Sequence, residues 1–160
     1  QALQSHPNEP ALLGEVAEME LQRGNLDRAS HDVAALLEQE PDSVEGILLR
    51  GRIDLKAARF DEAETDFRQA LAIEEDRPEF LFALGLALLA QGRRAEASEM
   101  YNRALQLTEE PGTIRSQGVA PLNALAETQS IPGAGEFLEW LEGAAMRTAQ
   151  PEAEESEASE

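Results

Sequence analysis

The fold of this chain is decided by residues 78–105, which read PEFLFALGLALLAQGRRAEASEMYNRAL. Two apolar stripes recur along this stretch at the spacing of amphipathic helices: Leu81, Leu84, Gly85 and Leu88, then Ala97, Tyr101, Ala104 and Leu105. Gly92 lies between the stripes, and a residue without Cβ suits the left-handed end of a helix. The stretch therefore predicts two antiparallel helices of about 14 residues joined by a tight turn.

The same arrangement recurs at a period of 34 residues. Three series keep the period: Ala29, Ala63 and Ala97; Leu3, Leu37, Leu71 and Leu105; Pro7 and Pro41. Pro10 and Pro78 are separated by twice that distance. Ala58 stands where Gly24 and Gly92 stand in the other units, so the middle turn is expected to be tighter or slightly strained. We predict an all-α chain of three helical hairpins, with units at 10–43, 44–77 and 78–111.

These residues resemble the tetratricopeptide repeat (TPR) family. The best match is Leu81-x-x-Leu84-Gly85-x-x-Leu88 followed by Ala97, Tyr101 and Ala104. The other units offer Leu13, Ala17, Gly24, Ala29 and Pro41, and Ile47, Gly51, Ala63, Phe67 and Ala70. Glu20, Arg50 and Asp54 depart from the pattern where apolar residues are usual. The resemblance implies a TPR-type α-solenoid of antiparallel helix pairs with a C-terminal capping helix.

Both ends of the sequence depart from this regular pattern. Residues 1–9 are expected to be the end of a truncated preceding repeat, and the chain to be part of a longer protein. Residues 112–148 are predicted to form a degenerate repeat and capping helix, in which Pro121 either kinks a helix or starts a new one. Phe137, Trp140 and Leu141 give the capping helix an apolar face. The Glu-rich residues 149–160 are predicted to be a disordered acidic tail.

Composition excludes several function classes. Among 160 residues, 32 acidic side chains oppose 13 basic ones, giving a formal net charge of −19. This field repels nucleic acid and anionic membrane surfaces. With no cysteine and only two histidines, His6 and His31, the chain offers no recognisable metal centre, and no cofactor is expected. No phosphate-binding glycine loop or nucleophile motif occurs, so we predict that the protein is not an enzyme.

By resemblance, the concave face of the solenoid is lined by the first helix of each pair. The candidate partner-binding residues on it are Glu15, Glu18, Leu48, Arg52, Leu55, Phe82, Leu86 and Leu89. Three interpretations of these leucines stay open: a partner segment docks on them, the helix bearing Phe137 and Trp140 covers them, or they are ordinary inter-helix core. A carboxylate clamp, as in some TPR co-chaperones, is disfavoured because only Arg52 and Lys56 are available and no Asn.

The function favoured by these features is a protein–protein interaction module, an adaptor or scaffold. Its expected partner is a protein or peptide, basic and amphipathic or anchored by apolar side chains. The alternative is a structural or regulatory array that packs or oligomerises an upstream domain, and homo-oligomerisation is left open. Localisation stays open, with the cytoplasm as the default expectation. Lys56 is the only lysine among the 13 basic residues, a bias that favours a bacterial source.

Overall fold

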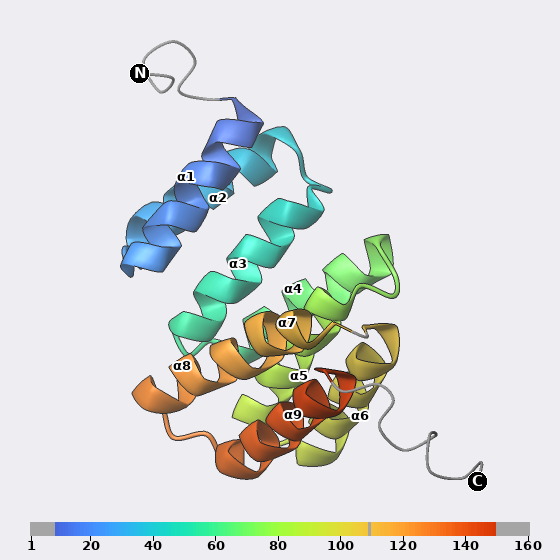
Figure 1. The fold of residues 1–160 in the computed structure, drawn as a ribbon. Helices are drawn as coiled ribbons and strands as arrows, with labels where there is room; N and C mark the ends of the chain where they lie inside the picture. The colour runs from blue at the N-terminus through green and yellow to red at the C-terminus, as the bar shows by residue number, and fades with distance from the viewer. Residues whose placement is uncertain (1–8, 109, 150–160) are drawn as a thin grey trace, which may run out of the picture.

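The computed structural model describes residues 9–108 and 110–149, and within these ranges the chain is helical and contains no strand (Figure 1). Six helices form three antiparallel hairpins: α1 (Pro10–Arg23) with α2 (Leu26–Gln39), α3 (Val44–Lys56) with α4 (Phe60–Ile73), and α5 (Pro78–Ala90) with α6 (Arg94–Leu107). Four further helical segments follow: α7 (Pro111–Thr113), the π-helical η2 (Ile114–Val119), α8 (Ala120–Thr128) and α9 (Ala134–Ala149). The all-α expectation is confirmed.

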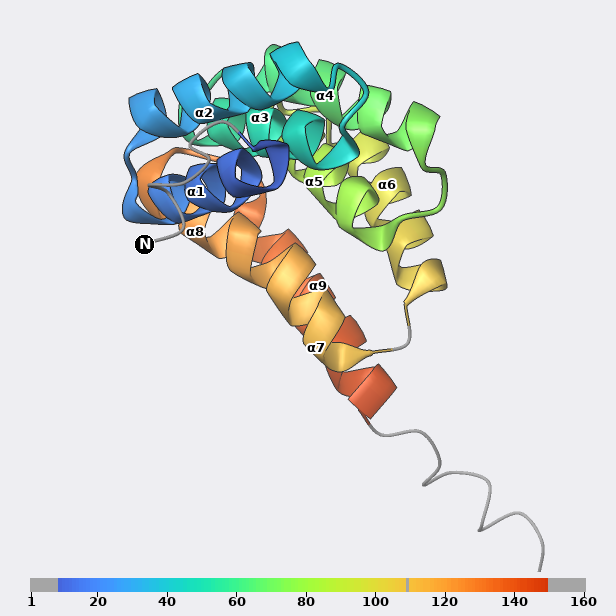
Figure 2. The same ribbon diagram turned by 90° about the horizontal axis from the view of Figure 1, so that it is seen from above.

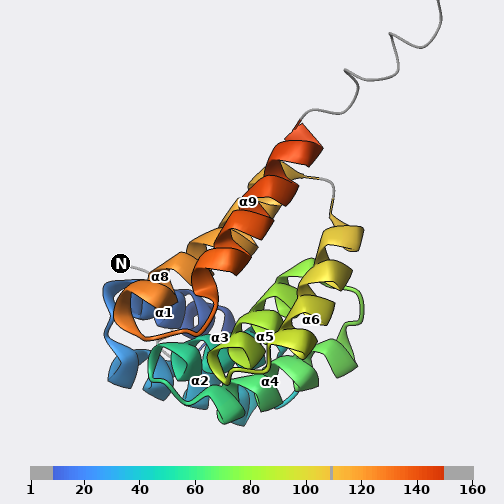
Figure 3. The same ribbon diagram turned by 90° about the horizontal axis from the view of Figure 1, so that it is seen from below.

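The three hairpins stack into an arc, with α1, α3 and α5 on its inner side (Figure 2). The run from α7 through η2 to α8 enters this arc from its open side, with α8 inside beside α1, and α9 returns antiparallel to it (Figures 2 and 3). η2 packs against α5 and α9, and α8 also contacts α9. We name residues 111–149 the C-terminal hairpin. It occupies part of the concave face of the solenoid.

Buried apolar side chains form two clusters of unequal size. The larger one joins α3 to α6 with the C-terminal hairpin and contains Phe67, Phe82, Tyr101, Phe137 and Leu141, all at most 5% exposed. The smaller one holds α1 and α2 against one face of α3 and consists of Ala17, Leu21, Ala29, Val33, Leu49 and Ile53. The first hairpin is therefore attached by fewer apolar contacts than the rest of the molecule.

The turns within the three hairpins share one geometry. Gly24, Ala58 and Gly92 all take positive φ, at 81°, 58° and 79°. In each turn a Schellman-type pair of backbone bonds closes the first helix; in the middle one, Ala58 N–H donates to Leu55 and Arg59 N–H donates to Asp54. The expected strain of the middle turn is thus present, because Ala58 carries a Cβ in the left-handed region.

The three charged departures from the repeat pattern are compensated by ion pairs. Arg50 binds Asp66 in bidentate fashion, at 2.9 and 2.7 Å. The Arg59 guanidinium donates two bonds to one oxygen of Asp54, at 2.8 and 2.6 Å. Glu20, only 6% exposed, accepts from Asn25 at 2.5 Å and from Arg23 at 3.2 Å. A polar side chain therefore replaces an apolar one without leaving a buried charge unpaired.

Pro121 does not interrupt the helical run from residue 111 to 128. The backbone keeps right-handed helical angles on both sides of α8's start, at Val119 and Ala120, and the turn before the proline is π-helical. Because proline has no N–H and its ring clashes with the carbonyl four residues earlier, the wider i to i+5 pattern accommodates it. The run up to residue 128 is therefore one continuous helix with a π-helical segment. Of the two outcomes expected for Pro121, a distorted helix or a new helix, the structure is nearer the distorted helix.

Two predictions concern residues that the structure does not describe. The truncated preceding repeat, except for Glu9, and the acidic tail, except for Ala149, lie outside the described residues. Within residues 9–108 and 110–149, every helix is too short or too polar to cross a membrane.

Candidate functional site

Two adjacent clefts on the concave face bring together five of the eight candidate residues. Glu18, Leu48 and Arg52 line the smaller cleft, and Arg52, Leu55 and Leu86 line the larger one. Arg52 therefore stands on the boundary between them. Glu18, Arg52 and Leu86 are spaced by the 34-residue period, so stacking of the repeats itself aligns these three side chains across α1, α3 and α5.

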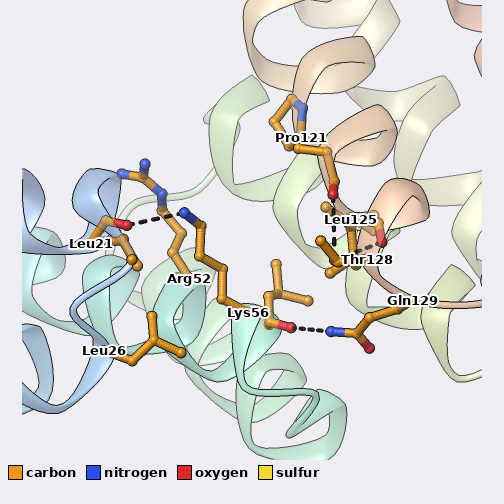
Figure 4. A pocket seen from close by; sticks show the side chains of 12 residues that line it. Leu21, Leu26, Arg52, Lys56, Pro121, Leu125, Thr128 and Gln129 are labelled. Carbon is orange, nitrogen blue, oxygen red and sulfur yellow. Dashed lines mark hydrogen bonds between the residues drawn. The ribbon is translucent and has the colours of Figure 1, made fainter.

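The larger cleft has a volume of about 620 Å³ and mostly apolar walls (Figure 4). Its residues come from α1, the turn after it and the start of α2, from α3 and α5, and from α8 and the residue that follows it: Leu21, Gly24, Leu26, Arg52, Leu55, Lys56, Leu86, Pro121, Ala124, Leu125, Thr128 and Gln129. One wall thus belongs to the solenoid and the other to the C-terminal hairpin. A cleft of this size and character suits the large apolar side chains of a ligand or partner.

Polar groups at the rim of the larger cleft are tied to the backbone or to each other. The Lys56 ammonium donates to the carbonyl of Leu21 at 3.0 Å, and the Gln129 amide donates to the carbonyl of Leu55 at 3.4 Å (Figure 4). The Arg52 guanidinium makes two bonds to the Glu18 carboxylate, at 2.5 and 2.9 Å. These bonds link α1 to α3 and α8 to α3, so both walls are held in place.

The smaller cleft, of about 330 Å³, is acidic. Four carboxylates line it, from Glu18, Glu45, Glu74 and Glu79, together with two guanidinium groups, from Arg52 and Arg77. Burial by itself would raise the pKa of Glu18, but hydrogen bonds from Arg52 and Gln22 and the charge of Lys56 outweigh it and lower the pKa. Glu18 is consequently ionised at neutral pH, and the cleft carries more negative than positive charge.

Phe82 and Leu89 line neither cleft, because both are fully buried. The backbone of Gly118 in η2 lies against Phe82: a Cβ added at Gly118 would come within 3.0 Å of the ring. Leu48, Leu55 and Leu86 are also buried, with 8%, 6% and 4% of their surface exposed. Of the three interpretations left open, this burial favours ordinary inter-helix core. The chain also covers part of the face, but with η2 and not with the helix that bears Phe137 and Trp140. The prediction that Phe82 and Leu89 contact a partner directly is corrected, because both side chains are buried.

The face of α9 that carries Phe137 and Trp140 packs on Tyr101 of α6. The Phe137 and Trp140 rings lie 5.6 and 6.2 Å from the Tyr101 ring centroid, and Phe82 lies 6.0 Å away on another side. The Tyr101 hydroxyl is buried without a hydrogen-bond partner among the described residues. Arg94 reinforces the contact through an ion pair with Glu136 and by stacking over the Phe137 ring. The capping helix α9 therefore packs mainly on η2, α7 and α8 and contacts α6 at Tyr101 and Arg94.

Glu15 is exposed on α1 and lines neither of the two clefts. The α8 residues of the larger cleft, among them Pro121 and Ala124, were missed by the repeat pattern because they lie outside its regular units. The i, i+3 spacing of Leu122 and Leu125 places both on one face of a helix, but no spacing shows where that helix docks. Across the residues described, no group of three or more His, Asp or Glu side chains is arranged to hold a metal ion.

Comparison with known proteins agrees with this architecture. Residues 48–111 match the family described as "Tetratricopeptide repeat". A similar solved structure is the crystal structure of MamA, with a TM-score of 0.65 and 18% sequence identity over 92% of this chain and 82% of that chain. No curated protein sequence gives a significant match. At this identity the structural likeness shows the fold alone.

The protein is thus an all-α helical-repeat solenoid. Residues 48–111 of this solenoid are similar to the tetratricopeptide repeat family. This family is typically non-enzymatic.

Proposed function

We propose that this protein is an adaptor or scaffold whose concave face binds one partner segment across the two clefts. The segment places an apolar anchor in the larger cleft and positions Lys or Arg side chains over the carboxylates of the smaller one. The observation that carries the proposal is the junction of an apolar and an acidic cleft at Arg52. The two clefts together are more specific than either one, because a partner must then match both the shape of the apolar cleft and the charge of the acidic one.

The charge of the whole molecule supports a basic partner. A net charge of −19 accelerates association with cationic segments and suppresses binding of anionic ones. The apolar walls supply most of the affinity, since fully burying one large apolar side chain contributes about 1.5–3 kcal/mol. The partner seats on the surface that remains beside the C-terminal hairpin and does not displace it, because displacement would expose Phe82, Leu141 and their neighbours together.

Selection of peptides from a random displayed library tests the proposal. We expect enriched peptides to carry one or two large apolar residues flanked by Lys or Arg, and their binding to weaken as salt rises. Ala124→Arg fills the larger cleft from an exposed position on α8, so it should weaken binding roughly tenfold or more without loss of stability. Ala120→Arg is the matched control, since Ala120 is exposed on the same helix and lines neither cleft.

Two results would contradict the proposal. Equal affinity of the selected peptides for the Ala124→Arg and Ala120→Arg variants would place the site elsewhere. Enrichment of acidic peptides would exclude the role of the smaller cleft. Charged substitutions at Leu86 and Leu89 are unsuitable, because both side chains are buried and their loss would unfold the protein.

The alternative role, an array that packs against another part of a longer protein, is favoured by one separate observation. The outer side of α1 carries exposed apolar surface at Met19.

A further inference from the structure

Four large apolar side chains are exposed among the described residues: Met19, Ile73, Leu107 and Met146. Ile73 and Leu107 stand 34 residues apart, so that repeat position is exposed in two successive units. Met19 differs, because the residues at its own position in the next two units, Ile53 and Ala87, are 2% and 0% exposed. At 45%, the exposure of Met19 is therefore not a property of its repeat position.

Ile53 is buried because α3 rests on the hairpin that precedes it. It belongs to the cluster that includes Ala29 and Val33 of α2. Two turns earlier on the same face, a Cβ at Gly46 would lie 2.8 Å from the Leu37 side chain. α5 repeats the contact, since it packs on α4 with Phe80 at the position of Gly46. Each first helix thus offers this face to the second helix of the preceding hairpin.

On α1 the same face carries Leu12, Val16 and Met19, at i, i+4 and i+7. We name these three residues the α1 outer face. Leu12 stands at the position of Gly46 and Phe80, and both Leu12 and Val16 are only half-buried. The α1 outer face therefore has the apolar spacing of a stacking interface but lacks a neighbour within the part of the chain that the structure describes.

We propose that the α1 outer face is the docking surface for one further helical hairpin of the same repeat type. The second helix of that hairpin packs on Leu12 and Met19 as α2 packs on Gly46 and Ile53. The argument rests on continuity with the two stacking interfaces already present in the structure. It does not depend on the concave clefts.

Insertion of a copy of residues 44–77 between Glu9 and Pro10 tests this inference in the full chain. The insertion keeps the 34-residue register, and the copied Arg77 then precedes Pro10 as Arg77 precedes Pro78. Oxidation of methionine by hydrogen peroxide, followed by mass spectrometry, reports exposure of Met19. Met146, 60% exposed at the far end of the molecule, is the internal reference. A chain with a 34-residue Gly/Ser insertion is the matched control.

We expect the inserted hairpin to slow oxidation of Met19 roughly tenfold relative to Met146, in line with the exposure of Ile53 and Ala87. The Gly/Ser insertion should leave the rate unchanged. The hairpin should also raise the urea midpoint, and Met19→Glu should remove that gain. Glu15→Leu, which restores the residue type of Leu49 at the same position, should increase it.

Equal oxidation of Met19 in the hairpin and Gly/Ser chains would overturn the proposal. So would protection of Met19 in the unmodified chain that disappears on dilution, because a second copy would then cover the face. Success or failure here leaves the peptide selection unaffected, since no residue of the α1 outer face lines either concave cleft.

Discussion

At the scale of single residues, Ala58 is the position where the chain departs most plainly from its own pattern. It takes the left-handed conformation that glycine takes in the other two turns, with φ of 58°. For a residue with a Cβ this conformation costs about 1–2 kcal/mol, and the extra freedom of an unfolded glycine returns about half of that difference. Ala58 keeps the left-handed conformation because α3 and α4, on either side of the turn, are packed into the core.

Ala58→Gly is therefore expected to raise the free energy of unfolding by about 0.5–1 kcal/mol, measured from urea transitions. Ala34→Gly is the matched control, since Ala34 is exposed in the interior of α2 and the same change should lower stability by about 1 kcal/mol. A loss of stability for both variants would show that Ala58 does not hold a left-handed conformation in solution.

At the scale of elements, Glu64 connects α4 to the turn between α5 and α6. Its carboxylate pairs with Arg93 at 2.6 Å and accepts from the Gln91 amide at 2.9 Å. Burial would raise its pKa, but hydrogen bonds from Gln91 and Arg68 and the charge of Arg93 outweigh burial and lower the pKa below 4.5. A carboxyl group with a lowered pKa in the folded state stabilises that state above pH 4.5, and its contribution is lost as pH falls through the folded pKa.

Glu64→Gln should therefore lower stability at neutral pH and flatten the loss of stability below pH 4.5. Urea midpoints measured from pH 7 downward would show this change of slope. Glu62→Gln, an exposed position on the same helix, should leave the slope close to that of the parent. If the stability of the Glu64→Gln variant falls with pH as steeply as that of the parent, the contact between α4 and the turn after α5 contributes nothing to the acid dependence of stability.

At the scale of the whole molecule, the two apolar clusters divide the protein unevenly. α1 and α2 contact the rest mainly through the smaller cluster on α3, whereas α3 to α6 share the larger cluster with the C-terminal hairpin. In a repeat array each unit is stabilised chiefly by its neighbours, so the first hairpin should open before the remainder.

We expect amide hydrogen exchange to be faster in α1 and α2 than in α5. Trp140, the only tryptophan, reports on the larger cluster through α9, so its fluorescence should change at higher urea than the helical circular dichroism begins to change. Coincident transitions with uniform amide protection would instead show that the two clusters unfold as one unit.

The sequence predicted more of the solenoid than of the site. The helical spacing of Leu81, Leu84 and Leu88 and the 34-residue period identify the hairpins and their turns, and even the strain at Ala58 follows from comparing units. The same register aligns Glu18 with Arg52 and Leu86. It could not show that Phe82 and Leu89 are covered, because their burial depends on a segment that does not follow the period.

The sequence by itself determined the helices, their pairing and the order of their stacking, since these depend on hydrogen bonds within helices and on contacts between consecutive repeats. Only the tertiary structure decided which part of the concave face stays open. The C-terminal hairpin enters the arc because the bare backbone of Gly118 fits against Phe82 and the face of α9 fits against Tyr101. Such complementarity of shape joins residues far apart in the chain, and no periodic pattern encodes it.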